Sequence, residues 1–105
     1  QQLEGVKVND TEEKKTRAHV FIKGKVQGVY FRQNTKEVAT KHRVTGWVCN
    51  LSDGRVEAVF EGDKTDVNDV IEWCHVGPPN SRVDDVDVRF KKYIGEFASF
   101  TINNN

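Results

Sequence analysis

The chain has 105 residues, of which 36% are apolar and 30% charged, and its 16 basic residues balance 16 acidic ones. This length suits one small domain, and the zero net charge argues against a general attraction to nucleic acid or anionic lipid. No apolar run approaches membrane-spanning length, and no secretory signal opens the chain. We therefore expect a soluble, cytoplasmic monomer. Because the sequence starts with Gln and lacks Met, we also expect that its start has been trimmed.

The N-terminal segment is polar and contains few large apolar side chains. Such a segment buries too little surface to offset the entropy lost on ordering. We predict a flexible tail over residues 1–16, a folded domain over residues 17–102 and a frayed end over residues 103–105.

The domain opens with a strand over residues 18–23, whose alternation places Ala18, Val20 and Ile22 on one face and His19, Phe21 and Lys23 on the other. A loop with two glycines follows over residues 24–31. The next segment, residues 32–42, predicts a helix. Its inward stripe consists of Thr35, Val38, Ala39 and His42.

Two strands over residues 44–51 and 55–61 flank an Asp53-Gly54 turn, a strong hairpin signal. We expect Gly62 to end the second of these strands, and either Asp63 or Thr65 to cap the helix that follows.

The second helix has its apolar residues at helical spacing on one face: Val67, Val70, Ile71 and Cys74. The run Gly77-Pro78-Pro79-Asn80 ends it. A strand over residues 83–93 follows, with Val86, Val88 and Phe90 alternating, and residues 97–102 form a possible fifth strand at an edge.

The order strand, helix, strand, strand, helix, strand predicts an α+β fold of ferredoxin-like βαββαβ architecture. In this fold a mixed, mainly antiparallel sheet carries both helices on one face.

The loop that enters the first helix is the candidate anion site. A helix start presents unpaired N–H groups and a positive dipole end, and Gly28 allows the backbone to curl into a nest of N–H groups. Arg32 adds a planar cation that matches phosphate oxygens. By spacing alone Arg32 can equally be a solvated surface charge. The loop is neither a Walker motif nor a dinucleotide-binding motif.

Residues 24–32, GKVQGVYFR, resemble the signature of the acylphosphatase family. Residues 46–56, GWVCNLSDGRV, followed by Gly62, are similar to the second signature of that family. The resemblance covers about residues 17–102. It continues at Trp73, at Gly77-Pro78 and over residues 97–102.

The resemblance implies the same ferredoxin-like fold and an acylphosphate phosphohydrolase that releases a carboxylate and inorganic phosphate from a small acyl phosphate. It implies that Arg32 binds the phosphate and that Asn50 orients the attacking water. The phosphate cradle would consist of the backbone amides of Gln27, Gly28, Val29, Tyr30, Phe31 and Arg32. A carboxylate is already a good leaving group, so we expect no cofactor and no metal.

Cys49 departs from the basic, amide or small residue usual in that family. Along a strand its side chain should point away from that of Asn50, so we expect little effect on chemistry. We expect Cys49 and Cys74 to be buried thiols, with a disulfide between them as the alternative. No catalytic role is assigned to the remaining candidates, which are His19, His42, His75, Trp47 and Trp73.

Other functions stay open on the same architecture. One is a module that binds an anion without hydrolysing it, and another is a piece of a larger carbamoyl-phosphate-processing protein. An RNA-binding module would need stacking aromatics and a basic surface, and a copper carrier would need a CxxC motif; the sequence has neither.

Overall fold

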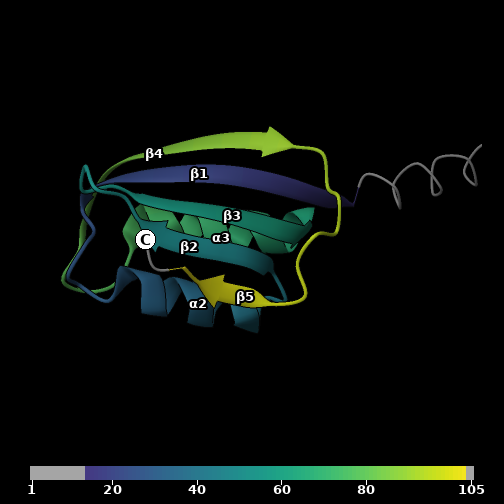
Figure 1. Cartoon of the computed structure of the whole chain (residues 1–105), viewed down its shortest axis with the longest axis horizontal. Coiled ribbons are helices and arrows are strands. Elements are labelled where there is room, and N and C mark those ends of the chain that lie inside the picture. The colour runs from purple at the N-terminus through teal and green to yellow at the C-terminus, as the bar shows by residue number, and fades with distance from the viewer. Residues whose placement is uncertain (1–13, 104–105) are drawn as a thin grey trace, which may run out of the picture.

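The computed structural model describes residues 14–103, which form a five-stranded sheet with two helices on one face (Figure 1). The elements in chain order are β1 (Lys15–Lys25), α2 (Phe31–Lys41), β2 (Thr45–Asn50), β3 (Val56–Asp63), α3 (Lys64–Val76), β4 (Arg82–Lys91) and β5 (Phe100–Ile102). The flexible tail and frayed end that we predict fall largely on residues 1–13 and 104–105, outside the described residues.

The strands lie in the order β4-β1-β3-β2-β5. β1 pairs antiparallel with both β3 and β4, β2 pairs antiparallel with β3, and β5 adds a parallel edge next to β2. The predicted ferredoxin-like fold, with a mixed sheet and a fifth strand at an edge, is confirmed. Because β1 and β2 run in the same direction, both end at the same side of the molecule, on the left in Figure 1.

The core lies between the helices and the inner face of the sheet. Ala18, Val20 and Ile22 of β1 are fully buried there, as their alternation predicts. The predicted stripe of α3 is buried as well, and the Phe31 ring lies 5.4 Å from the Trp73 ring, which joins the two helices. His42 is only half-buried, because it caps the C-terminal end of α2.

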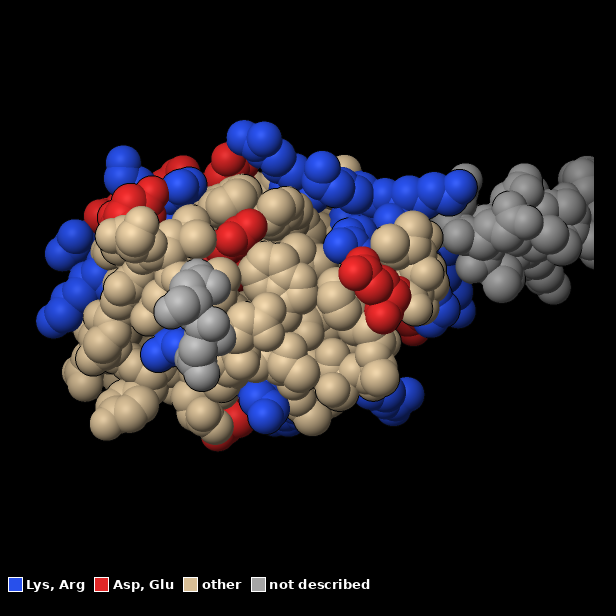
Figure 2. Space-filling view, viewed as in Figure 1, with Lys and Arg blue, Asp and Glu red and all other residues tan. Residues whose placement is uncertain are grey.

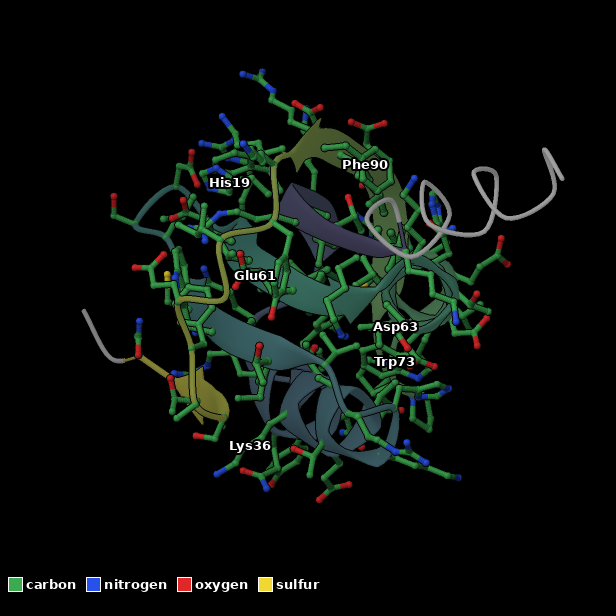
Figure 3. All side chains as sticks on the ribbon, turned by 90° about the vertical axis from the view of Figure 1, so that its right-hand side faces the viewer. His19, Lys36, Glu61, Asp63, Trp73 and Phe90 are labelled. Atoms are coloured by element: carbon green, nitrogen blue, oxygen red, sulfur yellow. The ribbon has the colours of Figure 1, made fainter. Side chains whose placement is uncertain are left out.

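The outer face of the sheet carries no helix in the part of the chain that the structure describes. Figure 2 shows this face as largely uncharged, with Lys and Arg gathered along the margin where β4 lies. The connection from β4 to β5, residues 92–99, lies against this face beside Glu61 (Figure 3).

One expectation about the β3–α3 junction is wrong, and another is met only in part. Gly62 does not end β3, because β1 begins at Lys15 rather than residue 18 and its Thr16 pairs with Gly62. Asp63 is the N-terminal cap residue of α3, but its side chain makes no capping hydrogen bond. The Asp63 carboxylate instead accepts a 3.1 Å hydrogen bond from Lys15 Nζ, the residue opposite it in register.

Other boundaries shift by one to three residues. α2 begins one residue earlier than expected, at Phe31, and β4 ends at Lys91 rather than residue 93. Phe90 is 58% exposed: it lies on the edge strand β4 and lines a shallow hollow with Thr16, Lys64 and Asn68. Within residues 14–103, no helix is long and apolar enough to cross a membrane.

Candidate active site

The β1–α2 loop, residues 26–30, carries the predicted cradle. Val26 and Val29 are buried and anchor this loop in the core. Gly28 has φ 76° and Tyr30 has φ 63°, while Val29 between them does not have a positive φ. Alternation between left-handed and ordinary backbone can turn successive N–H groups toward one side, the arrangement known as an anion-binding nest.

The start of α2 directly follows this loop. Tyr30 is the cap residue, and in the described part of the chain no side chain caps this helix end and no acidic residue occupies its first turn. The Asn34 N–H closes the first turn on Tyr30 O at 3.0 Å. The positive end of the helix dipole is therefore not offset by a carboxylate from its own first turn.

Arg32 and Asn50 line one cleft of about 490 Å³, together with Gly28 and Tyr30 of the loop. Asn50 is the last residue of β2, and its strand ends beside the start of α2. Cys49 lies on the opposite face, where its Sγ is 3.9 Å from Glu57 Oε1, as the alternation predicts.

The side chains of the other predicted cradle residues differ in position. Phe31 and Tyr30 line the cleft, and Tyr30 is 79% exposed at its mouth. Val29 is buried in the core, and the Gln27 side chain is hydrogen-bonded to the hairpin after Asn50, so these two contribute to a cradle through their backbone.

Sequence reasoning missed three lining residues: Val26, Gln33 and Ile102. Ile102 reaches the cleft because β5 pairs in parallel with β2, where it lies opposite Val48. That pairing joins segments that are far apart in the chain, so the sequence around Ile102 does not indicate that it lines the cleft. Gln33 follows Arg32 on the helix and could have been found from the helix start.

A second hollow of about 580 Å³ lies on the outer face between β1, β4 and the β2–β3 turn. Its arginines are already paired: Arg55 with Asp53 at 2.9 Å and Arg82 with Asp84 at 3.0 Å. Its four carboxylates also outnumber its three cations, so it repels a phosphate.

The remaining titratable side chains lie apart from the cleft. His19 Nε2 is 2.6 Å from Glu57 Oε2 on the outer face, and His42 bonds to Val38 O. Cys49 and Cys74 are buried and not joined by a disulfide, and burial raises the pKa of Cys74 to about 12. Among residues 14–103, no group of three or more His, Cys, Asp or Glu side chains could hold a metal ion.

Comparison with known proteins identifies a family. The family model described as "Acylphosphatase" matches residues 18–102. A protein named acylphosphatase from Pyrobaculum arsenaticum is 63% identical over 87 residues, which cover 82% of this chain and 92% of that protein.

Solved structures are similar as well. An acylphosphatase structure from Coxiella burnetii has a TM-score of 0.82 and 36% identity, covering 88% of this chain and 96% of that one. Full-length HypF, in its phosphate- and nucleotide-bound form, has a TM-score of 0.77 and 29% identity. This match covers 86% of the present chain but 12% of HypF.

Proposed function

The chain belongs to the acylphosphatase family, and on this premise we propose that Arg32 and the cradle amides hold the phosphate of an acyl phosphate while Asn50 orients the water. The activity itself is that of an acylphosphatase, a hydrolase of acyl phosphates. The observation that carries the proposed roles is the shared cleft, which brings Arg32 and Asn50 together from two different elements.

Binding of the phosphate is a matter of charge. The nest formed by Gly28, Val29 and Tyr30 and the N-terminus of α2 direct partial positive charge at one point, and the Arg32 guanidinium adds a full charge. A cation at a helix N-terminus is unfavourable by itself, because it meets the positive end of the dipole. A bound phosphate is negative and interacts favourably with both the Arg32 cation and the positive end of the dipole. The ligand and the site therefore stabilise each other.

Hydrolysis then needs alignment. The water oxygen attacks phosphorus while the bond from phosphorus to the acyl oxygen breaks, and the carboxylate leaves without being protonated. The Asn50 amide can donate to and accept from this water but cannot remove its proton. That proton passes to a phosphate oxygen of the substrate itself. The protein supplies position and charge neutralisation, which are the main requirements of phosphoryl transfer.

The test is hydrolysis of benzoyl phosphate by purified variants. We expect Arg32→Gln and Asn50→Ala each to lower kcat by roughly 10²- to 10³-fold, the cost of one preorganised donor, with the circular dichroism spectrum unchanged. Lys36→Gln is the matched control, since it removes an exposed cation of α2 that lies on the side toward β5 and does not line the cleft (Figure 3). Turnover near that of the parent in either site variant would exclude that residue from the mechanism.

The same assay separates an enzyme from a phosphate binder. We expect turnover to be unchanged by a chelator, since the proposed mechanism uses no metal. Binding of inorganic phosphate without release of phosphate from benzoyl phosphate would instead support the binding module.

We also propose that the enzyme acts as a cytoplasmic monomer. Two buried thiols that are not joined fit a reducing compartment. Size-exclusion chromatography with light scattering should give a mass close to 12.0 kDa, and a dimer mass would contradict the monomer.

A further inference from the structure

We infer that the Gln27 side chain is a positioning residue that fixes the end of β2, and with it Asn50, against the β1–α2 loop. Gln27 Nε2 donates a 2.7 Å hydrogen bond to Leu51 O and a 3.0 Å hydrogen bond to Arg55 O. The inference rests on the proposed role of Asn50 in orienting the water. It assigns a second task to a residue whose backbone already belongs to the proposed cradle.

The two accepting carbonyls lie at the two ends of the β2–β3 turn, residues 51–55. Leu51 N donates to Arg55 O at 2.8 Å, so the two residues face each other across the neck of the turn. A side-chain amide has two N–H donors, one for each carbonyl. Gln27 therefore holds both sides of the turn at once, and Leu51 is the residue that directly follows Asn50.

The loop is the fixed partner in this contact. Val26 and Val29, on either side of Gln27, are 1% and 8% exposed and are packed in the core. The tip of the turn, Ser52, Asp53 and Gly54, is exposed to solvent. Loss of the Gln27 contact should thus release the turn and the end of β2 and leave the loop in place.

This arrangement separates two functions of one site. The cradle and Arg32 need only the loop and α2 to bind a phosphate, whereas Asn50 reaches the same cleft from another element. A displacement of about 1 Å between a positioning group and a bound substrate can cost roughly 10²-fold in rate. The two hydrogen bonds of the Gln27 side chain link the loop directly to the turn, and so set the distance between Asn50 and a phosphate bound in the cradle.

The test is a double-mutant cycle on benzoyl phosphate hydrolysis. Gln27→Met keeps the length of the side chain and removes both donors. It should fold, because Leu51 O and Arg55 O each keep another donor, Gly54 N at 3.1 Å and Leu51 N at 2.8 Å. We expect Gln27→Met to lower kcat by roughly 10- to 100-fold, while KM and inhibition by inorganic phosphate stay close to those of the parent. Gln27→Ala should behave alike.

In the Asn50→Ala background, Gln27→Met should have little further effect, because the group that it positions is gone. Equal losses in both backgrounds would overturn the inference, since Gln27 would then act independently of Asn50. So would a weaker inhibition by inorganic phosphate with kcat unchanged, which would mean that Gln27 holds the cradle. Parent-like kinetics of Gln27→Met would also overturn it.

Asn34→Ala is the matched control. Asn34 Nδ2 also donates to a backbone carbonyl of the loop, Tyr30 O at 2.8 Å, but it does not bond to the turn. We expect parent-like kcat from this variant. If Asn50→Ala itself is fully active, the proposed role of Asn50 fails together with the inference. If Asn50→Ala is inactive and the Gln27 variants are not impaired, only the inference fails.

Discussion

Glu61 lies on β3 with its side chain on the face that the helices leave open, yet it is fully buried. Its carboxylate accepts hydrogen bonds from Ile94 N at 2.9 Å and Glu96 N at 3.0 Å, and it pairs with Arg17 at 3.1 Å. These contacts attach the connection from β4 to β5 to the sheet (Figure 3). Burial raises the pKa of Glu61, but the hydrogen bonds and Arg17 outweigh it and hold the pKa below its ordinary value.

We predict that Glu61→Gln lowers the free energy of unfolding at pH 7 by about 3 kcal/mol, the cost of breaking a buried charged network. A carboxyl group whose pKa is depressed by folding contributes stability above its unfolded pKa, near 4.5, and loses it as pH falls through the folded pKa. The difference in free energy of unfolding between parent and variant, measured in urea, should therefore shrink as the pH is lowered from 7 to 3.

The control for this prediction is Glu96→Gln. Its carboxylate pairs with the same Arg17 at 2.9 Å but is half-exposed, so we expect a loss below about 1 kcal/mol. A gap between parent and Glu61→Gln that is constant with pH would show that the charge of Glu61 is not what stabilises the fold.

At the level of single residues, the sequence predicted the parts of the candidate site that depend only on neighbouring residues in the chain. Gly28 stands where a left-handed backbone is required, and Arg32 stands at a helix start. Two features could not be predicted. The left-handed conformation of Tyr30 is unusual for a residue with a Cβ, and the bond from Gln27 to the turn depends on the neighbouring strand.

At the level of elements, the C-terminal end of α2 closes with a complete Schellman arrangement. Val44 N donates to Ala39 O at 2.8 Å, and Arg43 N donates to Thr40 O at 3.0 Å. This arrangement needs a left-handed residue after the cap, and that residue is Arg43, with φ 60°. Glycine usually occupies this position, because a Cβ makes the left-handed conformation costly.

We predict that Arg43→Gly raises the free energy of unfolding by about 0.5–1 kcal/mol. The left-handed conformation costs a residue with a Cβ about 1–2 kcal/mol. The greater conformational freedom of glycine in the unfolded chain offsets about 0.5–1 kcal/mol of the stability gained by removing that cost. Urea unfolding measures the change. Arg43→Ala keeps the Cβ and should give no such gain. Equal gains from Gly and Ala would mean that the arginine side chain, not the backbone, is unfavourable.

The order of elements and their buried faces were predictable because apolar periodicity is local. The alternation of β1 and the helical stripe of α3 both face the core as expected. The ends of elements were less predictable. β1 extends to Lys15 because β3 offers it partners up to Asp63, and this same pairing keeps Gly62 within its strand. Strand ends depend on a distant partner that the local sequence does not contain.

At the level of the whole molecule, Cys74 is a probe of the two-layer architecture. It lies on the inner face of α3, is fully buried, and has its pKa raised to about 12 by that burial. The thiolate is the reactive form of cysteine. In the native state Cys74 is thus both inaccessible and protonated at neutral or mildly alkaline pH.

We predict that, in a Cys49→Ala variant, Cys74 reacts with a thiol reagent only through global unfolding. At pH 8 its labelling should be at least about 10³-fold slower than in the unfolded chain, given the usual stability of a small domain. Labelling monitored by mass spectrometry over a urea series should follow the unfolding transition, because α3 must leave the sheet before the thiol meets solvent. Cys49, on the outer face in a Cys74→Ala variant, needs only a local opening and should react sooner. Fast labelling of Cys74 without urea would mean that α3 separates from the sheet while the rest of the fold persists.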